Sequence, residues 1–486
     1  MTGPIWTAYE AAAATGGLLG ARGTEPMWDA DRLPEESWTA TGLSIDTRTI
    51  RPGEMFVAVK DQRDGHDFLE QAFENGASAA LVSRAPQDLP RDKPLLFVPE
   101  ASGGTMAGLR AMAEAARDRC FGRFVGVTGS AGKTSVKEML RSALAPSGSV
   151  HAAVASFNNH LGVPLTLASL PSDAAYGVFE MGMSAPNEIR PLTKLVRPHV
   201  AIITTVNAAH LEFFDSVQGI ALAKAEIIEG VRRGGTVVLP ADNEYFGLLK
   251  MHADQQGVRV VQFGETAQGR DAVRLTGYEP SGDAAIVRCE VGGKPVRFTL
   301  SVSGRHQAVN ALSVIAAGVA VGAPLIKVVE GLETFRAGAG RGARYEVSLN
   351  GAHVTLIDES YNANPASMRA AFEVLAAQTP RAGGRRIAVI GDMKELGPTS
   401  AALHAGLAEF VDADIVHTAG TDTEALRAAL PDGIRGEHVP AAIELRRPLT
   451  DSLRDGDVVL FKGSNASRVG ALLSALLADA QAEDAA

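Results

Sequence analysis

The sequence predicts an α/β fold divided into three domains, and three observations indicate it. A chain of 486 residues is longer than one ordinary domain. Short apolar runs without strict polar alternation recur between helical patterns, as in parallel sheets that helices cover on both faces. A Gly- and Ala-rich stretch at residues 337–343 interrupts this alternation and predicts a linker. We therefore expect domains at residues 1–118, 119–340 and 341–486.

The N-terminal domain is expected to be a small α/β unit. Residues 55–59 and 79–82 are apolar runs that predict strands, and residues 68–77 predict a helix that ends near Gly76. A second helix over residues 103–119 would lead into the next apolar run. This helix places the first domain boundary near residue 119.

The central domain is expected to contain a mostly parallel sheet. Its apolar runs occupy residues 176–180, 200–206 and 236–239. Residues 285–291 and 296–302 instead flank a Gly-Gly pair, which predicts an antiparallel hairpin. An apolar helix is expected after the hairpin, over residues 310–321.

The C-terminal domain returns to α/β alternation, which predicts a Rossmann-like unit. A helix over residues 366–378 fits the crossover between its first two parallel strands. The expected strands lie at residues 354–357, 386–390, 414–418 and 457–461.

Composition limits the compartment and the partners. The formal net charge of −10, without long runs of like charge, disfavours a general nucleic-acid binder. Cys120 and Cys289 form no disulfide framework or metal motif, which fits a reducing compartment. The N-terminus lacks a basic start followed by an apolar core, and no run of about 18 apolar residues is present. We expect a cytoplasmic, monomeric protein with no signal peptide, membrane span or nucleic-acid partner.

A Gly-rich turn between an apolar run and a helical pattern predicts a P-loop-type nucleotide cradle. Glycines let backbone N–H groups approach anionic oxygens, and the helix N-terminus adds a partial positive charge. Lys133 supplies a cation for the β- and γ-phosphates, and Thr134 a hydroxyl for Mg²⁺. Val127 replaces the first glycine of the full motif, and an incidental glycine turn is the alternative. The cradle residues are Gly129, Ser130, Ala131, Gly132, Lys133, Thr134 and Ser135.

Two side chains follow apolar runs of the predicted central sheet. Glu180 ends one run, and His210 follows the next. Because the carboxyl ends of strands line the ligand crevice of open α/β sheets, both side chains are metal or phosphate candidates. The alternatives are a solvated glutamate and a surface histidine.

Lys224 occupies the apolar stripe of a predicted helix. Ile220, Lys224, Ile227 and Val231 follow one another at helical spacing. A lysine in such a stripe either snorkels, with its ammonium in water, or is buried with a depressed pKa. A buried neutral amine can react with CO₂ to form a carbamate, which is an anionic oxygen ligand. The pattern itself leaves both readings open.

Two polar segments offer further donors. The loop that contains Asn158 and Asn159 precedes an apolar segment, and His306, Gln307 and Asn310 open a helix. A side-chain amide there can contact an adenine edge, whereas helix capping is the alternative.

Taken together, these motifs resemble the ATP-dependent Mur ligase family over nearly the whole chain. The shared order is the cradle, the strand-end glutamate, His-Leu-Glu at residues 210–212, the helix of Lys224, the segment at 306–312, and Tyr-Asn-Ala-Asn-Pro at 361–365. Within the family, residues 46–48, 53–59, 64–68 and 358–368 are most similar to the ligase that adds a dipeptide, and the Asp-Asn-Pro-Arg motif of the diaminopimelate- or lysine-adding ligases is absent.

The resemblance implies a reaction and its substrates. An ATP-dependent amide ligase would join D-alanyl-D-alanine to UDP-N-acetylmuramoyl-tripeptide in peptidoglycan precursor synthesis. The tripeptide carboxylate would take the γ-phosphoryl group of ATP, and the dipeptide amine would then attack the acyl phosphate. The N-terminal domain would bind the UDP end, and the three domains would close around the substrates.

The resemblance also implies roles for individual residues. Lys133, His210 and Lys224 would be catalytic. Thr134 and Glu180 would bind one Mg²⁺, and His210 and a carbamoylated Lys224 the second. The remaining contacts would be Gly129 to Ser135, His306, Asn310 and Arg341 for ATP, and Asp46, Thr47, Arg48, Asn158, Asn159, Asp358, Tyr361 and Asn362 for the other substrates.

Some residues depart from the family pattern. Gln307, Gly342 and Glu359 stand where the family usually has Asn, Leu and Asp, and the continuation after Ser464 is also unusual. Two rival functions remain at this stage. One is a ligase for another amino acid, such as folylpolyglutamate synthase, which the Asp-Gly-His-Asp-Phe segment at 64–68 disfavours. The other is a nucleotide-dependent binding switch, which would need no dipeptide.

Overall fold

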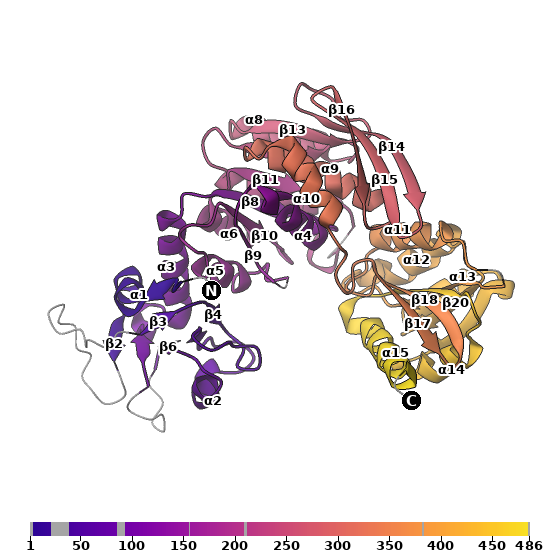
Figure 1. Cartoon of the computed structure of the whole chain (residues 1–486), viewed down its shortest axis with the longest axis horizontal. Coiled ribbons are helices and arrows are strands. Elements are labelled where there is room, and N and C mark those ends of the chain that lie inside the picture. Colours follow the sequence, from indigo (N-terminus) through magenta and orange to yellow (C-terminus); the bar gives the residue numbers. More distant parts are fainter. Residues whose placement is uncertain are drawn as a thin grey trace.

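The computed structural model describes residues 3–20, 38–84, 93–154, 156–208, 211–381 and 383–484. Three α/β parts follow one another along an arch (Figure 1). The N-terminal part lies at the lower left of that view, the central sheet at the top, and the C-terminal part at the lower right. This agrees with the predicted fold class.

The N-terminal part is built on a five-stranded sheet. Its order is β2 (Leu18–Gly20), β7 (Leu95–Phe97), β6 (Ala79–Val82), β5 (Met55–Val57) and β4 (Leu43–Ser44), parallel except for β2. The predicted helix at 68–77 is shorter than expected. Asp64 caps a 3₁₀ turn over Gly65–Phe68 by accepting the N–H of His66, so α2 covers only Leu69–Glu74.

Two further helices frame this part. α1 (Ala8–Thr15) begins at a capping box between Thr7 and Glu10 and lies beside the β1 (Trp6–Thr7) and β3 (Thr39–Ala40) pair. α3 (Gly104–Arg119) agrees with the helix predicted over 103–119 and packs against α5 (Gly162–Ala168) of the central part.

The central sheet has nine strands, and helices cover both faces. Along β11, Val200 and Ile202 belong to one apolar cluster, whereas Ala201 and Ile203 belong to the other. This alternation explains why the predicted strands lacked a polar face. The order is β16 (Lys294–Leu300), β15 (Ala284–Val291), β14 (Val273–Ser281), β13 (Arg259–Gly264), β12 (Thr236–Pro240), β11 (Val200–Ile203), β8 (Arg123–Thr128), β10 (Tyr176–Glu180) and β9 (Val150–Ala152).

The predicted hairpin in this sheet is confirmed. Gly292 and Gly293 take left-handed φ values of 57° and 80° between β15 and β16, as a two-residue hairpin turn requires. β9, β13 and β14 were not predicted, and in β14 Gly277 and Pro280 weaken the strand signal. The strand expected at 200–206 ends at Ile203, and the following residues turn toward the cradle loop.

Each face of the central sheet has its own helices. The first face carries α4 (Lys133–Leu144), α9 (Arg305–Ala320) and α10 (Leu325–Thr334), and the second carries α3, α5, α6 (Ile189–Val196), α7 (Val217–Ala225) and α8 (Phe246–Gln255). The helix predicted over 310–321 begins five residues earlier, at Arg305.

The C-terminal part contains a six-stranded sheet, parallel except for β17. The four predicted strands are confirmed to within two residues, and β17 and β21 were missed. The expected linker separates α10 from β17, and α11 (Pro365–Ala376) is the predicted crossover helix. The sheet order is β17 (Ala343–Leu349), β18 (Ala352–Asp358), β22 (Val458–Lys462), β19 (Arg386–Gly391), β20 (Ile415–Ala419) and β21 (Arg435–Val439).

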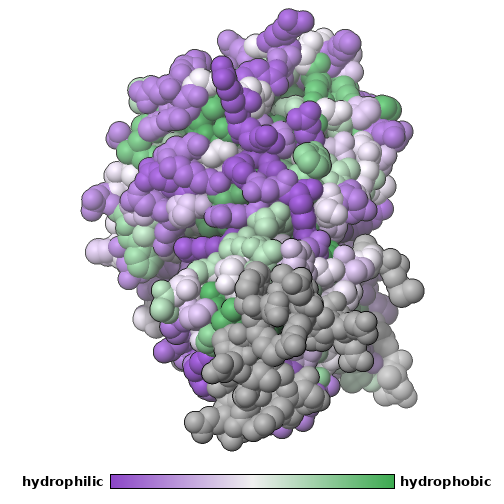
Figure 2. Space-filling view, turned by 90° about the vertical axis from the view of Figure 1, so that its left-hand side faces the viewer, coloured by the Kyte–Doolittle hydropathy of each residue, from purple (hydrophilic) through white to green (hydrophobic). Residues whose placement is uncertain are grey.

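The surface is mixed in polarity. On the face that looks out from the N-terminal side, hydrophobic residues are scattered among hydrophilic ones (Figure 2). Within the described ranges, no helix is both long and apolar enough to cross a bilayer.

Candidate active site

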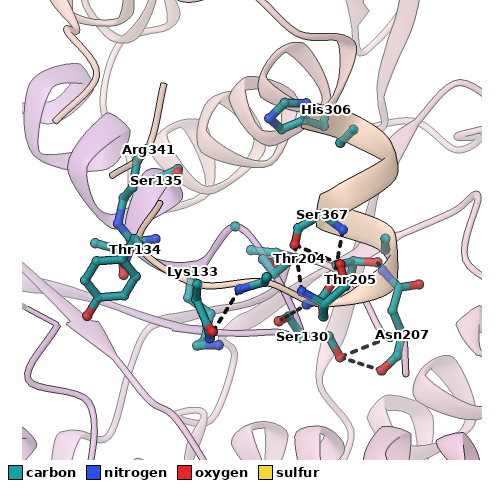
Figure 3. Close-up of a pocket in the computed structure, with 18 of the residues that line it drawn as sticks. Ser130, Lys133, Thr134, Ser135, Thr204, Thr205, Asn207, His306, Arg341 and Ser367 are labelled. Atoms are coloured by element: carbon teal, nitrogen blue, oxygen red, sulfur yellow. Dashed lines mark hydrogen bonds between the residues drawn. The ribbon is translucent and has the colours of Figure 1, made fainter. Parts of the chain in front are cut away.

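A cavity of about 1120 Å³ separates the central part from the C-terminal part, and both contribute to its walls. Ser130, Lys133 and Thr134 of the cradle share it with Arg341 and Ser367 of the C-terminal part (Figure 3). The predicted residues that line it are Ser130, Ala131, Gly132, Lys133, Thr134, Ser135, Asn158, Asn159, Glu180, His306, Asn310, Arg341, Tyr361 and Asn362. Among the other described predictions, Gly129, Lys224, Asp358 and residues 46–48 lie outside this lining.

The cradle loop connects β8 to α4 and requires glycine at two positions. A Cβ atom at Gly129 would lie 1.8 Å from the Thr204 hydroxyl oxygen, and one at Gly132 would lie 2.8 Å from Asn310 Oδ1. Gly132 also has a left-handed φ of 80°. Neighbouring segments therefore pack directly on the loop backbone, which is incompatible with an incidental glycine turn.

Lys133 starts α4 at the floor of the cleft. Its ammonium donates to the carbonyl oxygen of Gly129 at 2.8 Å (Figure 3). Burial lowers the pKa of Lys133, the nearby Glu180 carboxylate partly opposes that shift, and Arg341 adds repulsion.

Glu180 lies at the carboxyl end of β10 and is only 2% exposed, so it is not the solvated glutamate of the alternative reading. Its carboxylate accepts from Thr134 at 2.6 Å, Asn158 at 2.8 Å and Ser156 at 2.9 Å. Burial opposes ionisation of this carboxyl, but the Lys133 ammonium and the three hydrogen bonds outweigh it and lower the pKa of Glu180.

Lys224 is 2% exposed within α7, so the snorkelling alternative is wrong. Burial lowers the pKa of Lys224 well below its usual value, and the positive charge of Lys133 lowers it further. His210 lies outside the described residues.

The polar segments serve two purposes. Asn159 Oδ1 accepts the N–H groups of Leu161 and Gly162 and so steadies the start of α5. Asn310 is the sixth residue of α9, so it does not cap this helix. Its side chain instead packs against Gly132 of the cradle. His306 also belongs to α9, and burial together with Lys462 lowers its pKa to about 4.

The linker and the end of β18 form the opposite wall. Arg341 stacks on the Tyr361 ring, 3.8 Å from its centroid. The Asp358 carboxylate is buried and accepts the N–H of Gly340 and both donors of Ser360. Asp358 therefore holds the linker against the strand end.

Lys462, at the end of β22, continues this wall. It is 2% exposed and donates to the carbonyl oxygens of Glu359 and Asn362 at 3.1 and 2.8 Å. Burial lowers the pKa of Lys462 and raises that of Glu359.

Three residues close to the cradle were not among the predicted site residues. Ser156 bonds to Glu180, Asn207 bonds to the Ser130 hydroxyl through its backbone, and Asn364 reaches the Ser130 carbonyl at 3.3 Å. Ser156 belongs to the polar loop of Asn158 and Asn159, and Asn207 directly follows the apolar run at 200–206. Both positions could therefore have been predicted to lie near the site. The contact of Asn364 depends on the packing of two domains.

Residues 46–48 lie in the N-terminal part, away from the cleft. Arg48 forms an exposed ion pair with Asp46 at 2.6 Å, and the Thr47 hydroxyl donates to Gln71 at 2.9 Å. These contacts fix the conformation of the turn that follows β4.

The fold and the cleft define a multidomain α/β protein with a P-loop-type central domain. Its C-terminal domain is Rossmann-like and faces the cradle across the cleft. Residues 127–318 match the Mur ligase middle domain, and residues 343–465 match the glutamate ligase domain of the Mur ligases. The chain belongs to the Mur ligase family.

Similar proteins cover nearly the whole chain. The UDP-N-acetylmuramoyl-tripeptide–D-alanyl-D-alanine ligase of Escherichia coli K12 is 36% identical, over 90% of this chain and 94% of the relative. The ligase of the same name from Mycobacterium tuberculosis H37Rv is 33% identical, over 90% and 92%.

Solved structures agree with these relatives. MurF from Acinetobacter baumannii aligns with a TM-score of 0.80 and 28% identity, over 97% of this chain and 98% of that chain. MurF from Thermotoga maritima in complex with ADP aligns with a TM-score of 0.73 and 27% identity, over 91% and 98%.

Proposed function

We propose that this chain joins the amine of D-alanyl-D-alanine to the terminal carboxylate of UDP-N-acetylmuramoyl-tripeptide, with cleavage of ATP to ADP and phosphate. The observation that carries the proposal is the end-to-end similarity to ligases of that name, combined with a phosphate cradle that opens into a two-domain cleft. Residues 1–118 would hold the UDP end, 119–340 the ATP, and 341–486 the dipeptide.

ATP would bind in the cradle. The backbone N–H groups between Gly129 and Ser135 and the start of α4 suit phosphate oxygens, and Lys133 adds a positive charge. Asn310 and His306 on α9 suit the adenine, because both line the cleft beside the loop. Arg341 would contact the phosphates from the linker.

The cradle also fits a magnesium ion. The Thr134 hydroxyl and the Glu180 carboxylate offer hard oxygen donors 2.6 Å apart at the cavity surface. Among the described residues no cluster of three His, Cys, Asp or Glu forms a complete protein cage, and Mg²⁺ usually completes its shell with phosphates and water. The ion would offset the negative charges of the tripeptide carboxylate and the ATP phosphates where the two substrates approach each other.

Lys224 would carry a carbamate. Its burial favours the neutral amine, which attacks CO₂, loses a proton and becomes an anion. The carbamate and His210 would supply ligands for a second Mg²⁺. An unmodified ammonium at this place would repel the metal.

The remaining substrate contacts come from all three parts. Asp46, Thr47 and Arg48 would lie near the uridine diphosphate, and Asn158 and Asn159 near the peptide. Tyr361 and Asn362 would face the dipeptide from the C-terminal wall. Asp358 would act on the dipeptide through the linker backbone that it binds.

Two chemical steps follow. A tripeptide carboxylate oxygen attacks the γ-phosphorus, the bond to the β,γ-bridging oxygen breaks, and ADP leaves. The neutral amine of the dipeptide then attacks the acyl carbon, loses a proton, and inorganic phosphate leaves. Lys133 and the cradle N–H groups stabilise the charge that moves onto the leaving phosphates.

Phosphate release with a panel of UDP-muramoyl peptides and amines tests the proposal. We expect release only when a UDP-muramoyl tripeptide and D-alanyl-D-alanine are both present. Release with diaminopimelate or lysine but not with the dipeptide would refute the acceptor, and release without any amine would indicate a switch.

A further inference from the structure

A second lysine of α4 is fully buried, one turn beyond the cradle lysine Lys133. The side chain of Lys137 is 0% exposed. Its ammonium donates to the Ala153 carbonyl at 2.7 Å and lies 3.0 Å from a carboxylate oxygen of Glu138. Taking an ammonium out of water costs free energy, and an apolar side chain of similar volume would pack here without that cost. The ammonium therefore contributes something other than packing.

The carbonyl that Lys137 binds opens the segment that completes the surroundings of Glu180. β9 ends at Ala152 and pairs in parallel with β10, which ends at Glu180, so the chain that leaves β9 starts beside this carboxylate. Ser156 and Asn158 then donate to one Glu180 oxygen at 2.9 and 2.8 Å. Two of the three hydrogen bonds that favour the ionised carboxylate thus come from the segment after β9.

This segment is held at three points. Val154, near its start, is 91% exposed and contributes almost no apolar packing. The far end is fixed by Asn159, which accepts two N–H groups at the start of α5. The middle is fixed by the N–H of Gly182, which donates to the Asn158 carbonyl at 2.7 Å. Lys137 fixes the near end.

The helix α4 therefore controls both sides of the Glu180 carboxylate. Thr134, at the start of the helix, donates to the second oxygen of Glu180 at 2.6 Å. The Ser156 hydroxyl, which donates to the first oxygen, lies 3.4 Å from the Thr134 hydroxyl. By holding the segment against the same helix, Lys137 sets the distance between these two hydroxyl groups.

We propose that Lys137 is a positioning residue for the magnesium site of the cradle. Its ammonium holds the Ala153 carbonyl against α4 and thereby keeps Ser156 and Asn158 on Glu180, whose carboxylate would bind the ion. Lys137 does not line the cleft, so it acts only through this segment. The inference rests on the proposed function. Loss of the ammonium should weaken the binding of Mg²⁺ more than it slows the reaction at saturating Mg²⁺.

Lys137→Met keeps most of the buried stem and removes the ammonium. The first readout is amide hydrogen exchange of the peptide from β9 to the start of α5, in protein without nucleotide or metal. We expect faster exchange there than in wild type, because the segment loses the anchor at its near end. Lys137→Arg keeps a cation with several donors and should restore part of the protection. Equal exchange in Lys137→Met and wild type would overturn the inference.

The second readout is the Mg²⁺ concentration that gives half-maximal phosphate release when the other substrates are saturating. We expect it to rise about tenfold in Lys137→Met, with kcat at saturating Mg²⁺ lowered by less than about threefold, because the group lost lies behind the metal ligand. An unchanged Mg²⁺ requirement in this variant would refute the positioning role alone. Wild-type release that needs no Mg²⁺ would refute the proposed magnesium site itself.

A double substitution tests the route by which Lys137 acts. Ser156→Ala removes one hydrogen bond to Glu180 and should also raise the Mg²⁺ requirement. Adding Lys137→Met to Ser156→Ala should raise it by less than Lys137→Met does in the wild-type chain, because residues that act through one network are not additive. Fully additive effects would show that Lys137 acts by another route and would overturn the inference.

Val328→Ala is the matched control for stability. Val328 is buried on α10, which packs against α4, so this variant should unfold at a lower temperature with an unchanged Mg²⁺ requirement. An equal rise of the requirement in Val328→Ala and Lys137→Met would make Lys137 a purely structural residue. If Lys137→Met does not fold, Lys137→Gln replaces it, since the glutamine amide ends one bond short of the Ala153 carbonyl but keeps a polar group, and the same outcomes decide.

Discussion

The polar groups around Glu180 and those that follow β22 differ in how completely they are paired. On the central wall, the Glu180 carboxylate accepts three hydrogen bonds and Lys133 is held by the Gly129 carbonyl. On the C-terminal wall, the described structure leaves the Ser464 hydroxyl and the Arg468 guanidinium without partners.

This difference indicates two kinds of site. The central wall is preorganised, so it can hold a phosphate and a cation without rearranging, and preorganised dipoles are the main source of electrostatic catalysis. On the C-terminal wall, the Ser464 hydroxyl and the Arg468 guanidinium are hydrogen-bond donors without partners among the described residues. Such donors favour reversible binding of an anionic substrate. Substitutions at Lys133, Lys224, His306 and Tyr361 test this contrast, and the largest effect is expected at Lys133.

Lys133→Ala should lower phosphate release by at least about a thousandfold, because the cradle loses the lysine that would neutralise the phosphates. The unfolding temperature should stay close to that of wild type, since Thr204 donates to the Ala131 carbonyl and the N–H of Asn207 donates to the Ser130 hydroxyl, and neither contact involves Lys133. Steady-state release and a thermal melt measure the two quantities. Lys250→Ala, at an exposed lysine paired with Asp254, is the control. Near-normal turnover in Lys133→Ala would remove the ATP site from the cradle.

Lys224→Ala should lower activity by at least about a hundredfold through loss of the carbamate. Acetate or formate should restore part of the activity by filling the vacated space with a carboxylate. A carbamate carbon signal after ¹³CO₂ exchange, present in wild type and absent in the variant, gives a readout independent of turnover. Full activity in Lys224→Ala, or no such signal in active wild type, would contradict the carbamate.

His306 should make stability depend on pH. Its pKa is about 4 in the folded chain and about 6.5 in an unfolded one, so between these values the unfolded state binds more protons. The free energy of unfolding should therefore fall as pH falls from 6.5 to 4, by up to about 3 kcal/mol from this residue. His306→Gln should lose that part of the slope in denaturant titrations at pH 7 and pH 5, whereas His160→Gln, at an exposed histidine, should keep it. Equal slopes in His306→Gln and wild type would contradict the burial of a neutral imidazole.

Tyr361→Ala should have the smallest effect. It removes the ring on which Arg341 stacks and should lower kcat/KM for ATP by roughly fivefold, equivalent to about 1 kcal/mol for one cation–π contact. Tyr361→Phe keeps the ring and should behave as wild type toward ATP. An equal loss of kcat/KM in both variants would show that the Tyr361 hydroxyl matters and the stacking on Arg341 does not. Tyr361 would then be assigned to dipeptide binding.

Much of the fold was predictable because it depends on neighbours in sequence. β10, the hairpin between β15 and β16, and the strands β18, β19, β20 and β22 lie where apolar runs and turn residues predicted them. β14 and β17 were missed, since their strand signals are weak and partner strands decide whether such segments pair.

The sequence by itself determined the cradle, because its loop, lysine and helix start are contiguous and their chemistry follows from local geometry. It also placed Lys224 on an apolar stripe but did not distinguish snorkelling, the usual state of such a lysine, from burial. Only the tertiary structure decided that Lys224 is buried, that the Glu180 carboxylate receives three hydrogen bonds, and that no described residue bonds to the Ser464 hydroxyl. Burial and pairing depend on which distant segments pack together, and the packing of two domains across a cleft is not encoded in any single stretch of the chain.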